Sequence, residues 1–112
     1  MIDWARVADL YDDFGDADFV EVVDVFLEES DDGVQRLAQS QTPAEDRAAF
    51  HFLKGAALNL GFDELSRLCA EGEEAAASGA DTDKIKQQVC AQFPATCSLL
   101  QSQWRARLCP DR

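Results

Sequence analysis

The chain has 112 residues, which suffices for one compact domain over residues 1–112 and is too short for two. It carries 10 lysines and arginines against 22 aspartates and glutamates, a formal net charge of -12. A field of this sign repels nucleic acid and anionic lipid, so neither is an expected partner. The acidity selects no other partner by itself, because high charge also serves solubility alone.

Neither the start of the chain nor its cysteines indicate secretion. The first residues contain no basic region followed by a long apolar run, and no window is apolar for long enough to span a bilayer. We therefore expect a soluble, cytoplasmic protein in which the four cysteines stay reduced. Cys90 and Cys97 lie seven residues apart, unlike the closely spaced cysteines of zinc and redox pairs, which favours a role in core packing.

Helix signals recur along the chain, whereas strand signals are nearly absent. A short first helix over residues 3–11 places apolar side chains on one stripe and breaks around Gly15. A long second helix follows over residues 17–40. Gly33 lies inside it at a cost of about 1 kcal/mol relative to alanine. If this helix bends, we expect the bend at Gly33.

The clearest helix start lies at Thr42-Pro43-Ala44-Glu45. This run supplies an N-cap hydroxyl, a proline at the first helical position and a glutamate at the third, as in a capping box. The helix should end at Gly61, because glycine readily adopts the left-handed conformation that follows a helix. We expect Asp63 to cap the next helix, which ends at Gly79.

The last helix should begin near Asp81 or Thr82 and extend to Leu108, with apolar residues at spacings of three and four. Pro94 lies inside it, which predicts a kink or a break into two shorter helices. Four substantial helices with short loops and one apolar stripe each predict an all-α fold. We expect an antiparallel up-down-up-down four-helix bundle with a short additional N-terminal helix.

His51 is the only histidine of the chain, and the helical pattern around it predicts its orientation. Leu53, Ala57 and Leu60 form the apolar stripe, and His51 projects from nearly the opposite side, toward water. Along the chain from this helix, the first carboxylate on the histidine face is Asp63, which lies beyond the helix end. The residues that share this face, three, four or seven positions away, are Arg47, Lys54, Gly55 and Leu58.

These residue types together suggest phosphoryl chemistry. A neutral imidazole has one ring nitrogen with a free lone pair that can attack phosphorus, and Lys54 would offset the charge of the transferred group. Gly55 lowers helix propensity, which indicates open space for a partner beside His51. Three more positions offer small or apolar docking area: Ala48, Leu58 and Phe62. The simpler alternatives are an ordinary surface histidine, a solvated charged face and isolated surface hydrophobes.

Several other chemistries lack their parts in this sequence. One histidine cannot build a multi-histidine metal site, and no Gly-rich loop after a strand offers a nucleotide cradle. We therefore expect no metal site and no nucleotide site. A Cys–His dyad with Cys69 is disfavoured, because Cys69 lies on an apolar stripe whereas His51 points outward.

The run from His51 to Gly55, followed by Leu60-Gly61, resembles the signature of histidine-containing phosphotransfer (HPt) domains of two-component phosphorelays. The resemblance continues through the preceding and following helices and covers most of the chain. It implies that His51 is the phosphoacceptor, that Lys54 assists the phosphoryl group and that Gly55 permits approach.

The same resemblance implies partners. His51 would accept a phosphoryl group from a phospho-aspartate of a receiver domain, or from a histidine kinase such as a hybrid kinase, and transfer it to the aspartate of a response-regulator receiver. The chain would need no cofactor, because the receiver supplies the acidic pocket and its Mg²⁺. We expect a monomer without autonomous kinase activity.

Some details differ from the family pattern or stay open. Ala56 and Ala57 stand where many members have two small hydroxyl residues. Members often orient the histidine with a polar residue of the following helix, for which Glu73 and Arg67 are both candidates. Supporting roles are also open to Arg47 and Asn59.

Two alternative functions accompany the phosphorelay hypothesis. The first is a helical adaptor or inhibitor that binds a receiver or kinase without phosphotransfer. The second is the phosphoacceptor module of a chemotaxis-type kinase, which shares the chemistry and differs in its donor.

Overall fold

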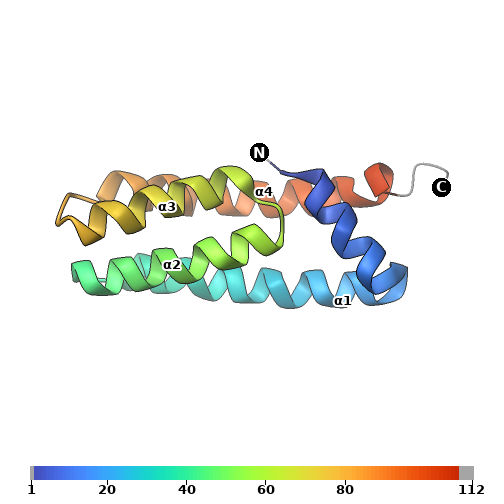
Figure 1. The fold of residues 1–112 in the computed structure, drawn as a ribbon, viewed down its shortest axis with the longest axis horizontal. Helices are drawn as coiled ribbons and strands as arrows, with labels where there is room; N and C mark the ends of the chain where they lie inside the picture. Colours follow the sequence, from blue (N-terminus) through green and yellow to red (C-terminus); the bar gives the residue numbers. More distant parts are fainter. Residues whose placement is uncertain (1, 109–112) are drawn as a thin grey trace.

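A computed structural model describes residues 2–108, and within this range the chain is helical without a strand. Each helix packs against two others in the cyclic order α1, α2, α3, α4. Consecutive helices run antiparallel, which gives an elongated bundle of 50 × 20 × 18 Å (Figure 1). The expected all-α four-helix bundle is confirmed. The helices are α1 (Trp4–Gln39), α2 (Pro43–Asn59), α3 (Asp63–Ala77) and α4 (Asp83–Leu108).

The N-terminal arm, residues 4–14, is the expected additional helix. Gly15 has φ 80° and ψ 168°, a conformation open almost only to glycine, so α1 changes direction there. The arm, blue in Figure 1, crosses the bundle beyond the turn between α2 and α3. It is fixed by a backbone hydrogen bond from Asp3 N–H to the carbonyl of Gly61 (2.6 Å) and by an edge-on contact of Tyr11 with Phe19.

Gly33 does not bend α1, because Gly15 is the residue of this helix with non-helical dihedral angles. A Cβ atom at Gly33 would lie 3.1 Å from a ring carbon of Phe52 and 3.2 Å from a methyl group of Leu53. The glycine therefore serves the close packing of α2 against α1. Its helix-propensity cost is offset by this contact rather than by a change of direction.

The ends of α2 follow the sequence signals closely. Thr42 accepts a hydrogen bond from the backbone N–H of Glu45 (3.1 Å), and the Glu45 carboxylate accepts one from Gln41 N–H (2.8 Å), one residue before the usual capping-box position. Gly61 has φ 72°, and a Cβ atom there would lie 2.6 Å from the carbonyl oxygen of Asp3. Gly61 is therefore required both by its dihedral angle and by the approach of the arm.

Helices α3 and α4 each differ from expectation in one detail. Asp63 is the first residue of α3 rather than its cap, and Phe62 occupies the N-cap position without a side-chain bond. Of the two expected outcomes at Pro94, a kink or a break, the break is wrong, because helix α4 runs unbroken through this residue. Pro94 is exposed, and buried Phe93 and Leu100 on either side keep both halves on one core, which outweighs a proline cost of about 3 kcal/mol.

A buried polar cluster closes the other end of the bundle, where α1 ends and α2 and α4 begin. Asp46 accepts hydrogen bonds from the hydroxyls of Ser40 and Thr82 and from the ammonium group of Lys86 at 3.1 Å. Burial by itself would raise the pKa of Asp46, but these three hydrogen bonds outweigh it and lower the pKa. We call Ser40, Asp46, Thr82 and Lys86 the bundle-end cluster.

Candidate functional site

The His51 side chain lies on the outer face of α2 and is 69% exposed. Leu53, Ala57 and Leu60 are buried in the core, so the predicted orientation of the helix is confirmed. The imidazole is therefore accessible to another protein while its helix is held on the opposite side.

Glu73 reaches His51 from the neighbouring helix α3. Its Oε2 lies 3.0 Å from His51 Nδ1, and its Oε1 accepts a hydrogen bond of 2.7 Å from Lys54 Nζ. The Glu73 side chain is 21% exposed, and each of its carboxylate oxygens has a partner. The expectation of a carboxylate-free histidine face holds within α2 but is wrong for the folded chain, because α3 places Glu73 there.

The contact with Glu73 selects the imidazole tautomer. The hydrogen bond from Lys54, opposed by partial burial and helped by the bond from His51, lowers the pKa of Glu73, so the carboxylate is ionised near neutral pH. An ionised carboxylate only accepts hydrogen bonds, so Nδ1 of His51 must carry the proton. In the neutral ring the lone pair then belongs to Nε2, the nitrogen that Glu73 does not contact.

Of the two residues considered for orienting His51, Glu73 makes the contact and Arg67 does not. Arg67 forms ion pairs with Glu64 and Glu71 of its own helix instead. Asn59 is half-buried, and within residues 2–108 its side chain makes no hydrogen bond. Spacing within one helix could not separate Glu73 from Arg67, because the contact depends on how α3 is rotated against α2.

Gly55 leaves open space beside the histidine. A Cβ atom added there would meet no atom within 4 Å, in contrast to Gly33 and Gly61. The space that the sequence indicated is thus present, and its use by a partner stays a prediction. Leu58, one turn further, is 55% exposed.

A shallow hollow of about 420 Å³ adjoins the imidazole on the side of the α2 N-terminus. Its lining consists of Ala44, Arg47, Ala48, His51 and Glu73. Ala44 was not identified from the sequence, although it lies one turn before Ala48 on the same face. The small side chains at these two positions leave room next to the ring.

Phe62 does not belong to this surface, and its predicted docking role is wrong. Its side chain is fully buried. The left-handed turn at Gly61 directs the chain back toward the bundle, so that Phe62 enters the core together with Leu60 and Leu65. The exposed apolar residue near this end of the site is therefore Leu58.

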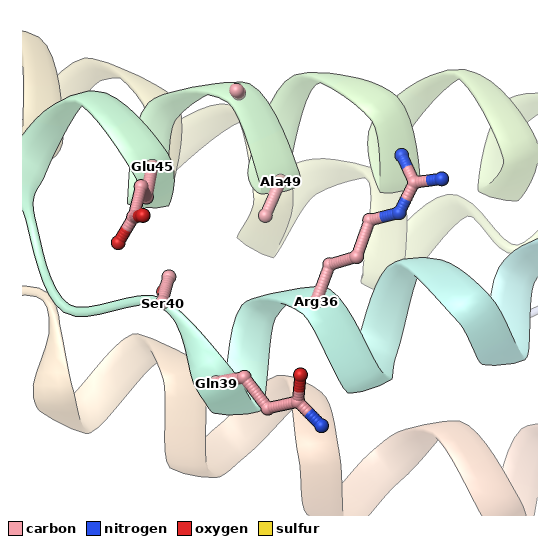
Figure 2. A pocket seen from close by; sticks show the side chains of 6 residues that line it. Arg36, Gln39, Ser40, Glu45 and Ala49 are labelled. Atoms are coloured by element: carbon pink, nitrogen blue, oxygen red, sulfur yellow. The ribbon is translucent and has the colours of Figure 1, made fainter.

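A second hollow, of about 360 Å³, lies between the end of α1 and the start of α2 (Figure 2). Figure 2 shows Glu45 close to Ser40 at one end and the guanidinium of Arg36 at the other. Both charged groups already have partners: Glu45 accepts the bond from the Gln41 amide, and Arg36 lies over the ring of Phe52 at 4.9 Å. We assign no chemistry to this hollow, since its charged groups are already engaged with Gln41 and Phe52.

Other reactive groups are not assembled into a site within the described residues. No group of three histidine, cysteine, aspartate or glutamate side chains in this range could hold a metal ion. Cys69 is buried, and this burial raises its thiol pKa to about 12, so it is not a nucleophile near neutral pH. Over the same range, no helix combines the length and apolarity needed to cross a membrane.

Comparison with known proteins gives one match. The sequence model described as the Hpt domain matches residues 21–104, which include His51, Lys54, Gly55 and Glu73. No curated protein and no solved structure matches the chain in the corresponding comparisons. The matched range begins after the N-terminal arm and extends almost to the end of α4.

Proposed function

Because the chain belongs to the Hpt-domain family, whose general activity is histidine phosphotransfer in phosphorelays, we propose that Nε2 of His51 is its phosphoacceptor. The donor is a phospho-aspartate of a receiver domain or a histidine kinase, and the acceptor is the aspartate of a response-regulator receiver. The observation that carries this proposal is the 3.0 Å contact of Glu73 with Nδ1, which leaves the lone pair on the exposed imidazole at Nε2.

The proposed transfer exchanges one bond to phosphorus for another. The Nε2 lone pair forms the new P–N bond while the P–O bond to the aspartyl carboxylate breaks and its electron pair leaves with that carboxylate. Nδ1 keeps its proton, so the phosphorylated ring carries positive charge. The ionised Glu73 offsets this charge and holds the ring in place. Transfer to the next receiver is the reverse exchange.

The surrounding residues support access for a receiver. Lys54 lies three residues after His51 on the same face of α2, and its Nζ is bonded to the carboxylate that also contacts the ring, so it is placed to offset the charge of the phosphoryl group. The open position at Gly55 admits the edge of the partner's acidic pocket, which brings its own Mg²⁺. Exposed Leu58 and Ala48 provide apolar area on either side of His51.

The test is phosphoryl transfer from a phosphorylated receiver domain to the purified chain. We expect acid-labile, alkali-stable label on the wild-type protein and none on the His51→Ala variant. Label on His51→Ala would contradict the proposal. His51→Gln tests the adaptor alternative, since signalling that persists with this variant would show that binding alone suffices.

A further inference from the structure

The two cations beside His51 are in different situations. Lys54 is 30% exposed and donates a 2.7 Å hydrogen bond to Glu73. Arg47 is exposed, and within residues 2–108 it has neither an ion-pair partner nor a hydrogen bond to its side chain. In a chain of net charge -12, this cation next to the single histidine is available to bind an anion from outside the chain.

The helix geometry brings Arg47 to the imidazole. Arg47 precedes His51 by four residues and therefore lies one turn earlier on the same face. Helical side chains lean toward the N-terminus, so the imidazole extends over the turn that contains Arg47. The two side chains line the same hollow, in which Ala44 and Ala48 leave space for a group of phosphoryl size.

The charges around His51 do not by themselves compensate the charge of a phosphoryl group. Glu73 and Lys54 neutralise each other, so of these groups only the phosphorylated ring, with one positive charge, opposes the charge of the phosphoryl group. A phosphoryl group brings close to two negative charges at neutral pH. The remaining cation that lines the hollow is Arg47. A guanidinium can also donate two parallel hydrogen bonds to phosphoryl oxygens, which an ammonium group cannot match.

We propose that Arg47 binds the phosphoryl group on His51 and shifts the transfer equilibrium from the phospho-aspartate toward the phosphohistidine. This inference rests on the proposed function and adds a phosphate-binding residue to it. No bond is made or broken by Arg47, because its guanidinium donates hydrogen bonds to the transferred group. The ligand that it takes is thus the phosphorylated side chain of its own helix.

The experiment compares Arg47→Gln, Arg47→Lys and the charge-matched control Lys84→Gln. Lys84 is also an exposed cation without an ion-pair partner in the described range, but it lies on α4 away from the hollow. We expect Arg47→Gln to move the equilibrium toward the receiver by about three- to tenfold, as for an exposed charge-assisted contact. The transfer equilibrium constant of Arg47→Lys should lie between those of wild type and Arg47→Gln. The constant of Lys84→Gln should stay within about twofold of wild type.

A second measurement separates phosphate binding from docking. Each protein is phosphorylated with phosphoramidate, which needs no partner, and the lifetime of the phosphohistidine is followed at neutral pH. We expect a shorter lifetime for Arg47→Gln and an unchanged one for Lys84→Gln. Equal lifetimes of wild type and Arg47→Gln would overturn the inference, because Arg47 would then act on the receiver. Wild-type protein that takes no label from either donor would instead contradict the proposed function itself.

Discussion

Two carboxylates, Asp46 and Glu73, do related chemistry at different places in this bundle. Asp46, at the start of α2, is bonded to Ser40 at the end of α1 and to Thr82 and Lys86 at the start of α4, and every partner is buried or half-buried. Glu73 bonds Nδ1 of the exposed His51 imidazole and Nζ of Lys54. We expect a carboxylate whose partners are all enclosed to stabilise the fold. In the proposed function, a carboxylate that binds one nitrogen of an exposed imidazole leaves the other nitrogen available for the reaction.

Asp46→Ala should give the largest effect, and that effect should be on stability. Removing the carboxylate leaves Lys86, which is 17% exposed, without its ion-pair partner and the buried hydroxyl of Thr82 without its acceptor. We expect the free energy of unfolding in urea to fall by about 2–3 kcal/mol. Phosphotransfer measured well below the unfolding midpoint should stay near the wild-type rate.

The acid limb of the stability curve provides the control. Because the pKa of Asp46 is lowered in the folded protein, its stabilising contribution is complete above the unfolded-state value of about 3.9. The contribution disappears as the pH falls through the folded-state pKa. Asp46→Asn should therefore flatten the loss of stability below about pH 4. An unchanged acid limb would mean that the cluster does not act through this charge.

Gly55→Gln extends the comparison from carboxylates to glycines. Gly72 lies under the ring of Phe50, which any Cβ atom would strike, whereas Gly55 faces open space. We expect Gly55→Gln to keep or slightly raise stability, since glutamine favours the helix by roughly 0.5 kcal/mol or more. Transfer from a receiver should drop about thirtyfold, or about 2 kcal/mol, because the side chain obstructs the partner.

Phosphorylation by phosphoramidate isolates this steric effect, because a small donor should still reach His51 in the variant. Gly72→Ala is the opposite case and should lower stability while leaving transfer by the folded fraction intact. Normal receiver transfer by Gly55→Gln would show that the open space has no role.

Glu73→Gln should have the smallest effect of the three on a free-energy scale. The oxygen of the glutamine amide can still accept a hydrogen bond from Nδ1–H of His51, but the neutral amide no longer offsets the charge of the phosphorylated ring. We expect transfer to slow by about tenfold, or about 1.4 kcal/mol, with an unfolding free energy within about 1 kcal/mol of wild type. Stopped-flow or quenched transfer assays measure the transfer rate, and urea unfolding measures the unfolding free energy.

An Arg67→Gln variant is the matched control, since it lies on the same helix and its ion pairs stay on α3. It should transfer at the wild-type rate. A larger loss for Arg67→Gln than for Glu73→Gln would contradict the assignment of Glu73 as the residue that orients His51.

Local signals were predictive where a short stretch decides the structure. The apolar stripe through Leu53 and Leu60 predicted the outward direction of His51, and the Thr42 and Gly61 signals predicted the bounds of α2. These features depend on backbone periodicity and capping within one helix. They are therefore readable without knowledge of the neighbouring helices.

Contacts between helices were harder to predict. The choice of Glu73, the burial of Phe62 and the packing role of Gly33 all depend on the rotation and separation of neighbouring helices. The bundle-end cluster gave no signal, because Asp46 in a first helical turn is also explained by the helix dipole. The local cost of Pro94 predicts a kink or a break, whereas the packing on both sides of the proline keeps α4 unbroken.

The hydrogen bond between Asp3 and Gly61 also bears on the order in which the molecule assembles. It joins positions separated by all of α1 and α2, so it is a non-local contact with a large loop-closure cost, and we expect it to form late in folding. Local pairing of α2 with α3 can come first, and the N-terminal arm docks onto the finished turn. We therefore also expect the arm to open locally without unfolding of the α2–α3 pair, so that the His51–Glu73 contact persists.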